Sequence, residues 1–133
     1  MAYETAKDKQ NEAKAGELLT SLGFTVCTFS KFAPCDFFAF TDKASYLVEF
    51  KKRSHNIGDF PTVMIPAKKL RKCLNISDQL NCEFLYVVEF NNGTFACSVK
   101  HYSTAPGGRT DRGDPNDFGV MAFINIEDFR RLG

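Results

Sequence analysis

Apolar and polar residues alternate along the chain with the periods of both helices and strands. Four apolar residues, Ala15, Leu18, Leu19 and Leu22, repeat at helical spacing near the N-terminus. Gly23 ends this run, so the pattern predicts an amphipathic N-terminal helix. Several later segments are short, β-branched and aromatic, which favours strands. The expected helices are Glu4–Leu22, Pro66–Leu80 and Glu127–Leu132, and the expected strands are Phe24–Phe29, Cys35–Thr41, Tyr46–Lys52, Phe84–Phe90, Thr94–Lys100 and Met121–Ile126.

Turn-forming residues separate these segments. Asn92-Gly93 between two apolar runs predicts a β-hairpin. The segments Arg53–Ile65 and His101–Gly119 contain proline and glycine without a clear period, so both are expected to be irregular. The second is a long loop, of a kind that is often mobile or functional. No repeat or long linker divides the 133 residues, which predicts a single α/β domain: a mixed β-sheet flanked by helices in the order α-β-β-β-α-β-β-β.

Composition and charge narrow the possible functions. The chain is 44% hydrophobic and 25% charged, so it is expected to fold, and no apolar run approaches the ~20 residues of a membrane span. A net charge of +1 at first argues against a nucleic-acid-binding protein. The charge is uneven, however, because residues 43–72 hold eight basic and two acidic side chains. The positive charge therefore lies in one strand and the helix that follows it.

Glu49 and Lys51 are charged residues within an otherwise apolar strand. Strand alternation directs both side chains to the same face, and a buried carboxylate is costly unless it is paired or holds a metal ion. One register of the preceding hairpin brings Asp36 beside them. Glu12, at the margin of the apolar stripe of the first helix, can reach the sheet. Carboxylates that converge with a lysine are what metal-assisted phosphodiester cleavage requires.

Glu12, Asp36 and Glu49-Phe50-Lys51, with the acid pair on a hairpin, resemble the PD-(D/E)XK nuclease superfamily. The spacing is similar to that of archaeal Holliday-junction resolvases over roughly residues 9–100. The resemblance implies a restriction-endonuclease-like fold and a metal-dependent endonuclease that cleaves branched or structured DNA during recombination. It also implies a homodimer, since a symmetric junction needs two paired cuts. The His101–Gly119 segment matches nothing in the resolvases and leaves the substrate open.

The resemblance also implies a role for each residue of the motif. Asp36, Glu49 and the backbone carbonyl of Phe50 would bind Mg²⁺, or Mn²⁺ in its place, and Glu12 would bind the ion directly or through water. Lys51 would hold the attacking water or stabilise the transition state. Basic residues in the strand and the following helix are expected to contact the DNA backbone. They are Lys52, Arg53, Lys68, Lys69, Arg71 and Lys72.

Other interpretations fit the same residues. The acids and Lys51 can form a simple surface ion pair, and a row of basic residues is often only a solvated helix face. A phage-type nuclease of linear DNA would use the same catalytic set, and a catalytically silent nucleic-acid-binding or interaction domain would share the fold. Arg109 and Arg112 would clamp DNA or pair with neighbouring acids. Five cysteines without a Cys-x-x-Cys motif, and no signal peptide, predict a reducing cytoplasm. For a nuclease of the resolvase or phage type, this would be the cytoplasm of a prokaryotic or phage-infected cell.

Overall fold

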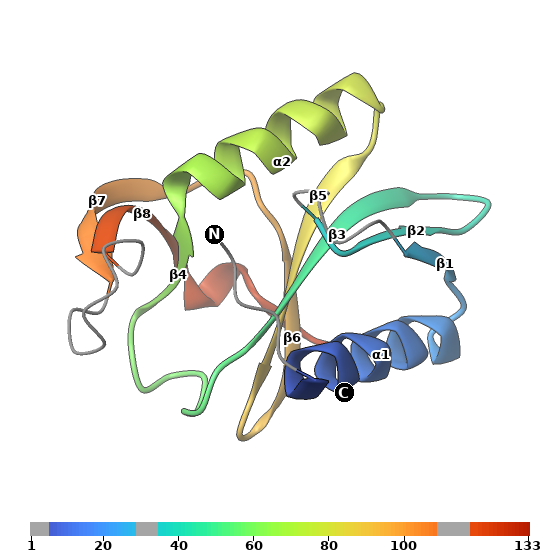
Figure 1. Ribbon diagram of the computed structural model, residues 1–133, viewed down its shortest axis with the longest axis horizontal. Helices are drawn as coiled ribbons and strands as arrows, with labels where there is room; N and C mark the ends of the chain where they lie inside the picture. Colours follow the sequence, from blue (N-terminus) through green and yellow to red (C-terminus); the bar gives the residue numbers. More distant parts are fainter. Residues whose placement is uncertain (1–5, 29–34, 109–117) are drawn as a thin grey trace.

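Two β-sheets and two α-helices make up the computed structural model, which describes residues 6–28, 35–108 and 118–133 (Figure 1). The helices are α1 (Ala6–Ser21), α2 (Ala67–Gln79) and the 3₁₀ helix η2 (Ile126–Asp128), and the strands are β1 (Thr25–Thr28), β2 (Phe37–Phe40), β3 (Ser45–Lys52), β4 (Thr62–Pro66), β5 (Glu83–Phe90), β6 (Gly93–Ser98), β7 (Ser103–Gly108), β8 (Phe118–Asn125) and β9 (Arg130–Arg131).

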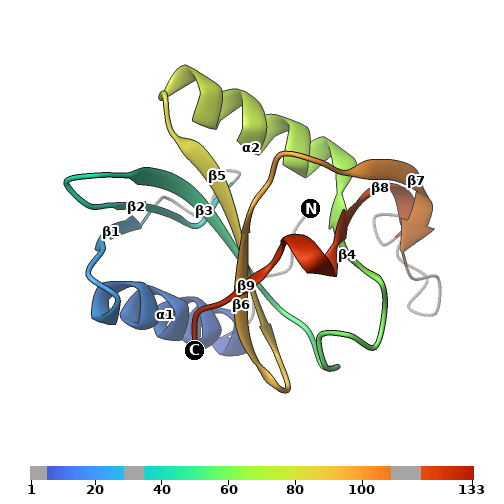
Figure 2. The same ribbon diagram turned by 180° about the vertical axis from the view of Figure 1, so that it is seen from behind.

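The larger sheet has the strand order β1-β2-β3-β5-β6-β9 and lies between the two helices (Figures 1 and 2). Its neighbouring strands are antiparallel except β3 and β5, which are parallel because the chain crosses over through β4 and α2. Alternation along β3 gives each helix its own core. Val48 and Phe50 pack with α1, whereas Leu47 belongs to the core under α2. Glu49 shares the face of Leu47 and therefore lies on the α2 side.

The smaller sheet has the order β4-β8-β7 and lies beside the N-terminal half of α2 (Figure 1). Ile65 of β4 and Ala122 and Ile124 of β8 are fully buried against the α2 core. Because β4 leads directly into α2, this sheet fixes where the helix begins. None of the helices in the described part of the chain is long and apolar enough to cross a membrane.

The predicted fold class is confirmed, since a mixed sheet is flanked by helices on both faces. The predicted β5–β6 hairpin is also present, and Gly93 takes a φ of 141° directly after its two-residue turn. Such a positive φ favours glycine, so Gly93 suits the first residue of β6, directly after the turn formed by Asn91 and Asn92.

Three segment predictions were wrong. Arg53–Ile65 is not irregular throughout, because Thr62–Pro66 forms β4; proline is tolerated at the ends of a strand that lies at a sheet edge. Ser103–Gly108 of the expected loop forms β7, whereas residues 109–117, which include Arg109 and Arg112, lie outside the described residues.

The C-terminal segment Glu127–Leu132 is not a helix. It consists of the end of η2 followed by β9, whose Arg130 and Arg131 pair with β6. A segment this short gains too few helical hydrogen bonds to offset the cost of nucleation, whereas the edge of β6 offers backbone partners to Arg130 and Arg131.

We expect Leu70→Ala to lower the free energy of unfolding by roughly 2–5 kcal/mol, because Leu70 of α2 is fully buried and the change leaves a cavity. Urea unfolding followed by circular dichroism measures the loss. Leu80→Ala, directly after the same helix at a side chain that is 53% exposed, is the matched control. Equal losses in the two variants would contradict the packing described for α2.

Candidate active site

Asp36 is fixed to β3 by both its backbone and its side chain. Its N–H donates to the carbonyl oxygen of Val48 at 3.0 Å, and its Oδ2 accepts from the N–H of Phe50 at 2.8 Å. These two hydrogen bonds lie on either side of Glu49 in the chain. The structure therefore places Asp36 beside Glu49, in the register that the sequence made possible.

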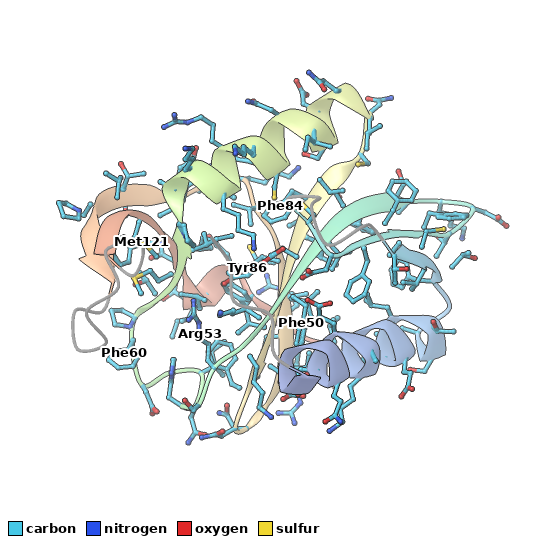
Figure 3. The ribbon with its side chains drawn as sticks, viewed as in Figure 1. Phe50, Arg53, Phe60, Phe84, Tyr86 and Met121 are labelled. Carbon is cyan, nitrogen blue, oxygen red and sulfur yellow. The ribbon has the colours of Figure 1, made fainter. Side chains whose placement is uncertain are left out.

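Glu49 lies in the middle of β3 and is 5% exposed. Its register partner on β5 is Tyr86, which is fully buried and closes one side of the carboxylate. The Tyr86 hydroxyl donates to the carbonyl oxygen of Met64 at 3.2 Å, and Arg53 Nη2 donates to the same oxygen at 2.8 Å. Figure 3 shows Tyr86 and Arg53 between the two sheets, with Phe50 on the opposite side, near α1. These hydrogen bonds join β3, β5 and β4 around Glu49.

Lys69, in the first turn of α2, forms an ion pair with Glu49. Its Nζ lies 2.5 Å from Glu49 Oε2. The lysine side chain is 40% exposed and the glutamate side chain 6%, so the ammonium covers the carboxylate from the solvent side. The other oxygen, Glu49 Oε1, is buried and accepts no hydrogen bond from any described residue. A buried carboxylate oxygen without a donor is costly, and it marks a place where a cation would be stabilised.

The electrostatics of this cluster favour an added cation. Burial, reinforced by the charge of Asp36, raises the pKa of Glu49 to about 8, although Lys69 opposes the shift. Burial alone would lower the pKa of Lys69, but the charges of Glu49 and Asp36 outweigh it and the pKa is raised. Two neighbouring carboxylates with an unsatisfied oxygen are hard ligands of the kind that divalent metal ions prefer. The site therefore fits a divalent cation.

The other basic residues named from the sequence have different surroundings. Lys51, at the end of β3, is exposed and shares the face of Glu49 by alternation. Lys52 forms an ion pair with Glu89 at 3.0 Å, and Arg53 is half-buried against β4. Both therefore already have protein partners. On α2, the exposed basic side chains are Lys68, Arg71 and Lys72.

Glu12 comes from the first helix. It is half-buried on α1 and lines a shallow groove with Gly16 and Phe37, on the face of the sheet opposite Glu49. Within the described ranges, no third histidine, cysteine, aspartate or glutamate joins Asp36 and Glu49 in a group that could hold a metal. The ligand roles of Glu12 and of the Phe50 carbonyl stay predictions.

The inward position of Lys69 is not among the predictions from the sequence, which treat it like the other basic residues of the helix. A signal was present, because Lys69 lies one helical turn before Cys73, which is fully buried. The Cys73 thiol is hydrogen-bonded to that of Cys35, whose pKa is raised by this bond and by burial. Cys35 directly precedes Asp36, so the helix carrying Lys69 is packed against the segment carrying the acid.

Comparison with known proteins identifies the family. A family model described as "Phage putative PDDEXK endonuclease" matches residues 1–132. The chain belongs to this PDDEXK endonuclease family. The acid pair and Glu49-Phe50-Lys51 of this PDDEXK protein agree with the resemblance found in the sequence. No curated protein matches the chain.

The fold of this PDDEXK protein is that of a known resolvase structure. The structure of Archaeoglobus fulgidus Hjc, described as a Holliday junction resolvase from an archaeal hyperthermophile, aligns with a TM-score of 0.66. The alignment covers 90% of this chain and 84% of that chain at 16% sequence identity. At this identity the structural alignment shows a shared fold and nothing beyond the fold, which confirms the predicted restriction-endonuclease-like architecture.

We expect the metal-free protein to lose stability relative to Glu49→Gln as the pH rises. The folded state raises the pKa of Glu49 from 4.5 to about 8, so it binds this proton more tightly than the unfolded chain. The resulting stabilisation is complete below the unfolded pKa and is lost as the pH rises through the folded pKa. Thermal unfolding in chelator, from about pH 5 to about pH 8.5, measures it. Parallel profiles for the wild type and Glu49→Gln would contradict the raised pKa.

Proposed function

We propose that this PDDEXK protein is a divalent-metal-dependent endonuclease that hydrolyses DNA phosphodiester bonds. The observation that carries the proposal is the acid pair on the α2 face of the sheet. Asp36 is locked beside Glu49 by two hydrogen bonds to β3, and Glu49 Oε1 is buried with no donor among the described residues. If the ion pair of Glu49 were purely structural, the charge of Asp36 beside it would only raise the free-energy cost of ionising Glu49.

Mg²⁺ is the proposed ion, with Mn²⁺ as a substitute, and Asp36, Glu49 and the Phe50 carbonyl are its proposed ligands. Glu12 of α1 is proposed to bind the ion directly or through water. The ion, when bound, supplies Lewis-acid stabilisation of the charge that develops on the phosphate. Lys51, on the same face as Glu49, is proposed to orient the attacking water or to stabilise that charge.

Branched DNA is the proposed substrate, cut by a homodimer during recombination. Support comes from the fold shared with Hjc, which is described as a Holliday junction resolvase, and from the exposed basic residues of α2. A linear-DNA nuclease is the second candidate, because the family description names a phage endonuclease and no particular substrate. Either activity would operate in the cytoplasm of a prokaryotic or phage-infected cell, where the DNA is.

Asp36→Asn and Lys51→Ala are expected to reduce Mg²⁺-dependent cleavage by roughly 10³-fold or more while the fold is retained. Asparagine keeps an oxygen that can accept the Phe50 hydrogen bond but removes the charge that would hold the ion. Cleavage of labelled DNA and thermal unfolding measure the two effects. Asp42→Asn, at an exposed turn of the same hairpin, is the matched control. Full activity in either site variant would exclude the proposed mechanism.

A panel of junction, flap, duplex and single-stranded DNA separates the candidate functions. We expect the four-way junction to be cut at least about 10-fold faster than the linear duplex, which corresponds to about 1.4 kcal/mol of preference. Equal rates on junction and duplex would favour the linear-DNA nuclease. No cleavage of any substrate with either metal would favour the silent binding domain.

Replacing Lys68, Arg71 and Lys72 together by glutamine is expected to weaken DNA binding without changing the fold. These side chains are exposed on α2, and every phosphate that they no longer neutralise should lower the salt slope of log Kd by about 0.9. Fluorescence anisotropy across a salt series, in chelator, measures the slope. Replacing Lys43, in the turn between β2 and β3, and Lys100, in the loop after β6, is the control. An unchanged slope in the triple variant would show that these three side chains do not contact the DNA backbone.

A further inference from the structure

Two lysines share the face of Glu49, one on β3 and one on α2. The first, Lys51, belongs to the motif that resembles the nuclease superfamily. The second, Lys69, has no place in that motif, yet its ammonium lies on Glu49 itself, 2.5 Å from Oε2. We propose that Lys69 is a second catalytic lysine, whose ammonium contacts the scissile phosphate. The inference rests on the proposed function, because it takes Asp36 and Glu49 as the ligands of the metal ion.

Lys69 lies on the solvent side of Glu49. Glu49 is closed off on the β5 side by buried Tyr86. Its own side chain is 6% exposed, whereas that of Lys69 is 40% exposed. Asp36 is fixed beside Glu49 by its hydrogen bond to the N–H of Phe50, so the Lys69 ammonium, in contact with Glu49, lies at the acid pair. A phosphate that approaches these acids from solvent meets the Lys69 ammonium.

Buried neighbours hold the backbone of Lys69 in place. One turn further along α2, Cys73 is fully buried and hydrogen-bonded to Cys35, the residue before Asp36. Leu70, next to Lys69, is also fully buried. The backbone of Lys69 is therefore held against the segment that carries the acids, and the side chain is pre-organised at the site. The neighbouring basic residues of α2 are exposed and suit more distant phosphates.

Hydrolysis would use this ammonium as a fixed positive charge. The water oxygen forms a bond to phosphorus, and the bond between phosphorus and O3′ breaks. The hydroxyl of the water stays on phosphorus, its remaining proton goes to O3′, and the products are a 5′-phosphate and a 3′-hydroxyl. Lys69 stays protonated and donates to a non-bridging oxygen, whose negative charge grows in the transition state. Removing one such donor typically costs about 10²–10³ in rate.

The test compares Lys69→Gln and Lys69→Arg with Lys100→Gln. Glutamine keeps a donor for Glu49 but removes the charge, and arginine keeps the charge. Lys100 pairs with Glu83 at 2.8 Å on the surface, so Lys100→Gln removes a Lys–Glu pair that does not involve the proposed metal ligands. We measure single-turnover cleavage, Mn²⁺ binding by calorimetry without DNA, and thermal unfolding. In Lys69→Gln the cleavage rate should fall roughly 10²-fold while Mn²⁺ affinity is not weakened. Lys69→Arg should recover at least about a tenth of the wild-type rate, and Lys100→Gln all of it.

Three results would overturn the assignment of Lys69. Wild-type cleavage by Lys69→Gln is the first. A parallel loss of Mn²⁺ affinity and cleavage is the second, because the lysine would then only support the acids. The third is an equally reduced cleavage rate in Lys69→Arg and Lys69→Gln with Mn²⁺ still bound, because the positive charge would then make no contribution to the rate. Failure of the wild type to bind Mn²⁺ or cut DNA is distinguishable from all three, because it removes the proposed function itself.

Discussion

The buried carboxylate of Glu49 is the constraint on which the rest of the site depends. A charge in the middle of a sheet loses its hydration, and the cost is of the order of several kcal/mol unless partners replace the water. In this fold the partners come from outside β3. Lys69 covers one oxygen from α2, and the other oxygen has no donor among the described residues. Asp36 adds a second negative charge rather than relieving the first. An arrangement that worsens its own electrostatics is typical of a functional site.

The crossover between β3 and β5 explains how this cluster is assembled. Parallel strands need a long connection, and here the connection contains both β4 and α2. The Met64 carbonyl of β4 receives both the Tyr86 hydroxyl and Arg53, which fixes β4 against the main sheet. Because α2 begins where β4 ends, this also fixes the first turn of the helix and hence Lys69. The position of a side chain on α2 thus depends on hydrogen bonds from Tyr86 of β5 and from Arg53, the residue after β3.

The parts that could be predicted from the sequence are those with local signals. Strand alternation and a short turn were enough to place Asp36 beside Glu49, because register in a hairpin is set by neighbouring residues. The strand β4 and the inward direction of Lys69 depend on contacts distant in the chain, and prolines concealed the first. The role of Glu12 stays a prediction, because a helix stripe gives its margin residues but not which face of the sheet the helix covers.

The fate of the basic residues shows why a count of charges is a poor guide to a binding surface. Residues 43–72 hold eight basic side chains. Of these, Lys52 forms an ion pair with Glu89, and Arg53 donates a hydrogen bond to the carbonyl oxygen of Met64. Lys69 is engaged by Glu49. Three exposed basic side chains of this stretch lie together on α2, the helix that covers the face carrying Glu49. A polyanion attracted to them is drawn to the side of the sheet where the acid pair lies, and not to the α1 side. The net charge of the whole chain is small, but α2 carries both Lys69, which pairs with Glu49, and the exposed basic residues that attract a polyanion. A small net charge is therefore compatible with electrostatic attraction of DNA to the face that carries the acid pair.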